Sequence, residues 1–81
     1  MKHHREDRVC DLRGEVCPYT FVKTKLAVEE IQPGQVVRVI LDYPPAVNNV
    51  IANIEAEGHQ VTHYTRASKD DWYVWIKKDS G

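Results

Sequence analysis

Two apolar helical stripes, each closed by a glycine, divide this chain of 81 residues into short alternating elements. The first stripe begins after Pro18 and stops at Pro33-Gly34, and the second follows a break at residues 42–45 and stops at Gly58. Proline is tolerated in the first turn of a helix, and glycine adopts the left-handed conformation that ends one. The spacing predicts a helix over residues 18–31 and a second helix that ends at Gly58.

The segments around these helices have the composition of β-strands. Residues 9–12, 36–41, 61–66 and 72–77 are alternating or β-branched runs bounded by turn residues. The predicted order is β-α-β-α-β-β, and because crossovers are right-handed, both helices should cover one face of the sheet. We therefore predict an α/β two-layer sandwich with a four-stranded mixed sheet and two helices on one face.

The two faces of this sheet differ in their predicted side chains. Trp72, Val74 and Ile76 alternate along the last strand and should share the face that packs on the helices. The other face should carry an unusually aromatic set for a surface open to water, consisting of Arg38, Ile40, Tyr73 and Trp75.

Length and charge limit the domain organisation and the partners. A chain of 81 residues suits one domain, so we predict a disordered leader at 1–8, a single domain at 9–78 and a tail at 79–81. No stretch approaches the length of about 20 apolar residues that a membrane helix needs, and no signal-peptide pattern follows Met1. The net charge of −1 offers no field for a phosphate backbone. We expect a cytoplasmic protein without membrane insertion and without direct nucleic-acid binding.

The two cysteines occupy different predicted environments. Cys10 lies inside the first strand, where cysteine behaves as a small buried hydrophobe. Cys17 directly precedes the first helix, where unpaired N–H groups and the helix dipole favour the thiolate and make it nucleophilic. A buried structural role for Cys17 remains open, as does a Cys10–Cys17 disulfide, which needs Cα atoms within about 7 Å.

Charged residues near Cys17 have a structural and a functional interpretation. Arg13, Lys23 and Lys25 could add positive potential near the thiol or contact an acidic donor. For the two lysines we favour a solvated surface, whereas Arg13 is the better candidate for a supporting role. Asp42 is predicted to cap the second helix by accepting from its first N–H groups.

Two histidines follow the second helix. His59 comes directly after Gly58 and is expected to cap or pack at the helix exit, and His63 lies on the following strand. A metal site needs three or four converging ligands, and Cys17 is remote from both histidines in the sequence. We therefore predict no metal and no cofactor.

An ordered set of residues over 9–78 resembles the TusA/SirA-like sulfur carriers, which include YedF-like proteins. The shared positions are Leu12, Gly14, Cys17, Pro18, Lys25, Gly34, Asp42, Pro44, Gly58-His59, Trp72, Val74, Ile76 and Lys77. The family's diagnostic feature is a cysteine-proline-any-proline motif that opens the first helix. The resemblance implies the same β-α-β-α-β-β sandwich, and it implies that Cys17 accepts sulfane sulfur as a persulfide and passes it on.

The motif departs from the family at one position. Thr20 stands where the family has its second proline, and Tyr19 fills the variable position. Proline would restrict the unfolded chain by an effect under about 1 kcal/mol, so we expect a changed partner preference before any loss of reactivity. The site residues we predict are Cys17 as the catalytic thiol, with Pro18, Arg13 and Thr20 in support.

The resemblance also implies the kind of partner. We expect a monomer that takes sulfur from a protein donor, a cysteine desulfurase or a rhodanese-like protein, and gives it to a protein acceptor. The routes that the family serves are tRNA thiolation, cofactor synthesis, and thiosulfate or sulfur metabolism. The alternative is a non-catalytic adaptor or regulator that docks through the sheet face with Tyr73 and Trp75, since Trp and Tyr anchor many interfaces.

Overall fold

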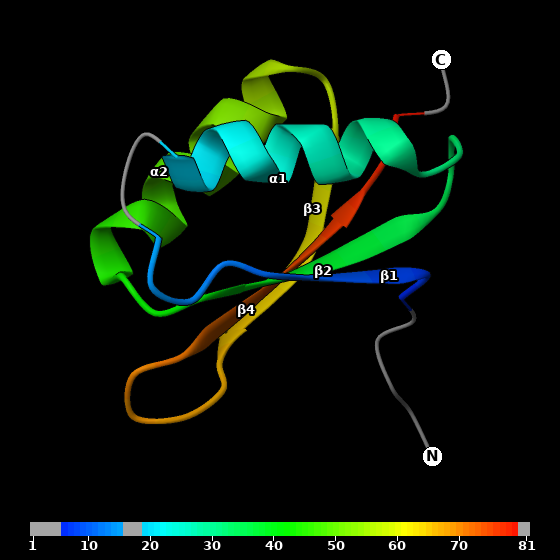
Figure 1. Cartoon of the computed structure of the whole chain (residues 1–81). Helices are drawn as coiled ribbons and strands as arrows, with labels where there is room; N and C mark the ends of the chain where they lie inside the picture. The colour runs from blue at the N-terminus through cyan, green and yellow to red at the C-terminus, as the bar shows by residue number, and fades with distance from the viewer. Residues whose placement is uncertain (1–5, 16–18, 80–81) are drawn as a thin grey trace.

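The computed structural model describes residues 6–15 and 19–79, which form four strands and two helices (Figure 1). In chain order these are β1 (Arg8–Asp11), α1 (Tyr19–Glu30), β2 (Val36–Leu41), α2 (Pro44–Ala56), β3 (Gln60–Arg66) and β4 (Trp72–Lys77). The predicted order β-α-β-α-β-β is confirmed, and the predicted bounds of β2 and β4 agree with the structure at both ends.

The four strands form one mixed sheet in the order β1-β2-β4-β3. β1 runs parallel to β2, and β4 runs antiparallel to both β2 and β3. Both helices lie on the same side of this sheet (Figure 1). The predicted two-layer α/β sandwich is therefore the observed fold.

The core lies between this face of the sheet and the helices. β2 is one of the two inner strands of the sheet, as its apolar, β-branched and proline-free sequence favours, and its alternate residues Val37, Val39 and Leu41 are fully buried. Val74 and Ile76 of β4 are also fully buried on this face, as predicted, and Trp72 packs partly against them.

The first helix, α1, buries one side against the sheet, and Lys78 binds its C-terminal end. Thr24 and Val28 are fully buried, and the Thr24 hydroxyl donates to the Thr20 carbonyl at 2.6 Å. This bond satisfies a hydroxyl among apolar neighbours. At the other end, the Lys78 ammonium donates to the carbonyls of Glu29 at 3.2 Å and Ile31 at 2.8 Å, which stabilises the last turn of α1.

The second helix begins on two prolines and ends on a glycine, as its sequence indicates. Pro44 and Pro45 occupy its first turn. Gly58 follows with a φ of +96°, and the N–H groups of Gly58 and His59 donate to the carbonyls of Glu55 and Ile54 at 3.0 and 3.3 Å. This pair of bonds is a Schellman motif, in which the left-handed position favours glycine.

Residues 6–8, which we predicted as part of a leader, contact the sheet. β1 begins at Arg8, and the Asp7 N–H donates to the Val36 carbonyl at 2.7 Å while the Asp7 carboxylate accepts from the Val36 N–H at 2.9 Å.

No helix within 6–15 and 19–79 is long and apolar enough to cross a membrane.

Candidate functional site

The predicted thiol site lies at the junction of β1 and α1. Cys17 and Pro18 fall outside the described residues, but the chain on both sides of them is described. A loop leaves β1 through Leu12 to Glu15, and α1 begins at Tyr19, two residues after Cys17 in the sequence. This loop and the first turn of α1 are therefore the described segments that flank Cys17 in the sequence.

Asp42 binds this loop instead of capping α2. Its two carboxylate oxygens each lie 3.1 Å from the Gly14 nitrogen, and both accept a hydrogen bond from the Gly14 N–H. The N-cap of α2 is Tyr43, which makes no side-chain capping bond, so the prediction that Asp42 caps this helix is wrong. Pro44 and Pro45 carry no N–H in the first turn, and the next N–H, that of Ala46, already donates to the Tyr43 carbonyl at 2.9 Å.

Arg13 is held by carboxylates on both sides of the loop. Its Nε and Nη2 atoms lie 3.0 and 2.7 Å from the two oxygens of Asp11, and its Nη1 lies 3.5 Å from Asp71 in the β3–β4 turn. The hydrogen bonds and charge of Asp11 raise the pKa of the Arg13 guanidinium further. The guanidinium joins the end of β1 to this turn, and its charge is largely compensated there.

The Arg13–Asp11 pair predicts an acid-shifted carboxyl group. Hydrogen bonds from the Arg13 side chain and backbone lower the pKa of Asp11 from its usual 3.8 to about 2. Because the folded pKa is depressed, the pair stabilises the fold above pH 3.8, and this contribution is lost as the pH falls toward about 2. An NMR titration of the Asp11 carboxyl should find a midpoint near 2, returning toward 3.8 in Arg13→Gln. A wild-type midpoint near 3.8 would contradict the pairing.

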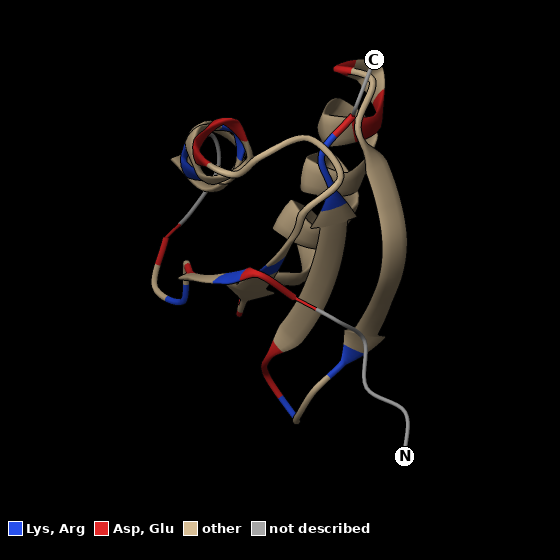
Figure 2. Cartoon of the chain, turned by 90° about the vertical axis from the view of Figure 1, so that its right-hand side faces the viewer, with Lys and Arg blue, Asp and Glu red and all other residues tan. Residues whose placement is uncertain are grey.

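The two lysines of α1 lie on the surface in ion pairs. Lys23 Nζ is 2.8 Å from a carboxylate oxygen of Glu15, and Lys25 Nζ is 3.7 Å from Glu57. Basic and acidic residues are interspersed over the chain, as Figure 2 shows. Such exposed pairs contribute little stability and are screened by salt. The lysines form no concentrated positive field, in agreement with their interpretation as solvated residues.

Thr20 and its neighbours give α1 two different faces. The Thr20 side chain is fully buried, so it offers no surface to a partner. Tyr19, Val22 and Leu26 lie at helical spacing on the opposite side, and 59%, 47% and 53% of these residues is exposed. We call these three residues the α1 stripe. Such an apolar row is unusual on the solvent side of a helix.

The open face of the sheet is aromatic but partly covered. The ring of Tyr73 lies edge-on to Trp75 at 5.8 Å, and the Arg38 guanidinium lies 4.5 Å from the Tyr73 ring centre. Glu6 binds Arg38 Nε at 3.0 Å and accepts from the Trp75 indole at 3.3 Å. Only 7% of Trp75 is exposed, so the aromatic set that we predicted offers less surface than the sequence indicated.

Cys10 lies in β1 as a free thiol and packs partly against the core. Burial raises the pKa of this thiol, with the carboxylate of Asp11 adding to the effect. A raised pKa leaves little thiolate at neutral pH. Cys10 is therefore the less reactive type of cysteine, in agreement with its predicted packing role.

His59 and His63 each contact a neighbouring residue of the fold. His59 Nδ1 accepts from the Asp79 N–H at 3.0 Å, and the ring of His63 lies 5.3 Å from that of Trp75. The residues that the structure describes contain no group of three or more His, Cys, Asp or Glu side chains placed to hold a metal ion.

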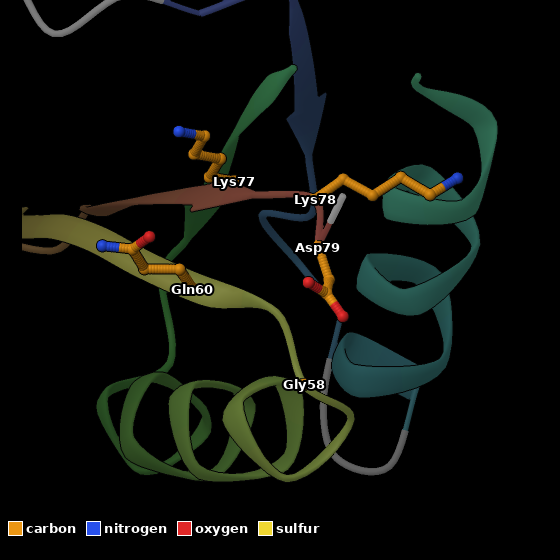
Figure 3. Close-up of a pocket in the computed structure, with 5 residues that line it drawn as sticks. All are labelled: Gly58, Gln60, Lys77, Lys78 and Asp79. Carbon is orange, nitrogen blue, oxygen red and sulfur yellow. The ribbon is translucent and has the colours of Figure 1, made fainter. Parts of the chain in front are cut away.

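A small polar pocket lies at the far end of the sheet. It encloses about 180 Å³ and is lined by Gly58, Gln60, Lys77, Lys78 and Asp79 (Figure 3). Lys77 pairs with Val36 at the beginning of β2, whereas Asp42 follows the end of that strand. The pocket is therefore remote from the Gly14 loop that Asp42 binds, and Lys78, which points toward α1 in Figure 3, already binds the carbonyls of Glu29 and Ile31 at the end of α1.

Comparison with known proteins identifies the family. A profile described as "Sulfurtransferase TusA" matches residues 8–78. A curated relative from Archaeoglobus fulgidus is 46% identical over 72 residues, which cover 89% of this chain and 82% of that protein. YedF from Escherichia coli K12 is 33% identical over 61 residues, covering 75% and 79% of the two chains. Both relatives bear the name "Putative sulfur carrier protein".

Solved structures agree with this assignment. A SirA-like protein from Desulfitobacterium hafniense superposes with a TM-score of 0.78 at 27% identity, over 89% of this chain and 97% of that one. HP1264 from Helicobacter pylori, at 20% identity, shares the fold with a TM-score of 0.68 over 88% and 96% of the two chains. The resemblance stated from the sequence is thus confirmed, and the chain belongs to the TusA sulfurtransferase family of sulfur carriers.

Proposed function

We propose that this protein is a sulfur carrier in which Cys17 accepts sulfane sulfur as a persulfide and passes it to a protein acceptor. The family supports the carrier role. The observation that carries the choice of residue is that α1 begins at Tyr19, two residues after Cys17. A thiol next to a helix N-terminus is stabilised as the thiolate by the helix dipole and by unpaired N–H groups. Cys10 lacks that environment, and burial raises its pKa.

The transfer needs only an accessible thiolate. The Cys17 thiolate attacks the outer sulfur of a donor persulfide, R–S–SH, and a new S–S bond forms as the donor's S–S bond breaks. The products are Cys17–S–SH and the donor thiolate R–S⁻, so atoms and charge balance. In the second step an acceptor thiolate takes the outer sulfur, and the Cys17 thiolate leaves. Neither step requires a metal or an acid–base pair on this chain.

Protein partners are proposed for both steps, a cysteine desulfurase or rhodanese-like donor and a protein acceptor. The α1 stripe supports this proposal because it presents exposed apolar side chains along the helix that follows Cys17. Three half-exposed side chains cover far less than the roughly 800 Å² per partner of a stable interface. A contact of this size suits a carrier, which must release each partner. Delivery to tRNA thiolation, to cofactor synthesis or to thiosulfate metabolism are the routes we propose.

The proposal is tested by alkylation of Cys17 with iodoacetamide as a function of pH. A carrier should show an apparent pKa for Cys17 clearly below about 8, because the thiolate is stabilised. Peptide mapping separates Cys17 from Cys10, whose alkylation serves as the internal reference and should require higher pH. A pKa of Cys17 at or above about 8.5 would instead favour the adaptor alternative, in which the thiol has no chemical role.

A further inference from the structure

Three consecutive residues before the thiol are each held by a different partner. Arg13 binds Asp11 and Asp71, Gly14 donates to Asp42, and Glu15 pairs with Lys23. The Glu15 N–H also donates to the Leu12 carbonyl at 3.1 Å, which closes a turn. The loop that leads to Cys17 is therefore fixed by contacts from four separate parts of the chain.

The hydrogen bond between Gly14 and Asp42 lies just beyond the point where the main-chain pairing of β1 with β2 ends. The last main-chain bond of this pair runs from the Leu12 N–H to the Ile40 carbonyl at 2.9 Å. Gly14 then turns the chain with a φ of +90°, a conformation that a side chain would strain. Its N–H points to both oxygens of Asp42, which lies 28 residues later and just past the end of β2.

We infer that Asp42 is a positioning residue for sulfur transfer: its carboxylate holds the Gly14 turn, which lies three residues before Cys17 in the sequence. This inference rests on the proposed function. Transfer between two sulfur atoms needs them in contact along one line, and a displacement of about 1 Å in such a reaction costs up to about a hundredfold in rate.

The test compares Asp42→Ala with Asp42→Asn. The alanine variant removes the acceptor, whereas the asparagine variant keeps an oxygen for the Gly14 N–H and removes only the charge. With glutathione persulfide as the donor, Asp42→Ala should load Cys17 at least about tenfold more slowly than the wild type, and Asp42→Asn should restore most of the rate. Glu55→Ala, which removes a carboxylate from the exposed side of α2, is the matched control and should load at the wild-type rate.

The pH profile of Cys17 alkylation separates positioning from charge and from general destabilisation. If Asp42 acted through its charge, both variants would shift the Cys17 pKa equally, and the inference would be overturned. Equal loading rates for Asp42→Ala and the wild type would also overturn it. Thermal unfolding, measured for each variant beside its loading rate, identifies a variant that fails to fold. If Asp42→Ala does not fold, Asp42→Ser takes its place in the comparison with Asp42→Asn. If the wild type itself does not load, the proposed function fails, which is a different outcome.

Discussion

Incubation with a small-molecule persulfide should add about 32 Da to the intact protein, and the Cys17→Ala variant should gain nothing. The substitution should abolish the mass gain completely, because no other group replaces a thiolate that both accepts and releases the sulfur. Intact-protein mass spectrometry measures the added atom directly, and a reductant such as dithiothreitol should remove it.

Cys10→Ala is the matched control for this experiment, since it removes the other cysteine of the chain. It should retain the full mass gain because Cys10 packs partly against the core and burial raises the pKa of its thiol. Peptide mapping should place the added sulfur on Cys17. Sulfur found on Cys10, or a mass gain that survives in Cys17→Ala, would refute the assignment.

Replacing Leu41 by alanine should lower the free energy of unfolding by about 2–5 kcal/mol. Leu41 ends the inner strand β2 and is fully buried, so its truncation removes apolar contacts and leaves a cavity beneath the helices. A domain of this size has a total stability of about 5–15 kcal/mol, so the variant should lose a large share of it. Urea denaturation followed by tryptophan fluorescence measures the loss.

Leu26→Ala makes the same chemical change on the α1 stripe, where 53% of the residue is exposed. It should change the free energy of unfolding by less than about 0.5 kcal/mol, since little buried area is lost and alanine favours helix. Similar losses for Leu41→Ala and Leu26→Ala would mean that the described core is not the one that stabilises the fold.

Much of the architecture was predictable because it is written in local patterns. Periodicity predicts the bounds of β2 and β4 and the face of β4 that packs against the helices. Turn chemistry predicts that α2 begins on prolines and ends on a glycine. The position of Cys17 before a helix follows from the same signals, together with the family motif. These features depend on residues within one or two turns of each other.

Contacts between distant segments could not be predicted in this way. Asp42 has the residue type and spacing of a helix cap, yet it binds Gly14, and only the two prolines after Tyr43 indicate that a cap would find few donors. Arg13 binds both Asp11 and Asp71, and the second of these lies 58 residues away in the sequence, so no local pattern indicates it. The buried indole of Trp75 is a third case, because it donates to Glu6, 69 residues away in the sequence.

Local patterns in the sequence were enough to predict the order of the elements, the two-layer architecture and a cysteine placed before the first helix. The packed fold was needed to show what holds the loop of residues 12–15 and which apolar side chains remain on the surface. The physical reason is that helix and strand periodicity, caps and turns act over a few residues. The partners of a carboxylate or a guanidinium depend instead on which strand ends and turns the packed fold brings together.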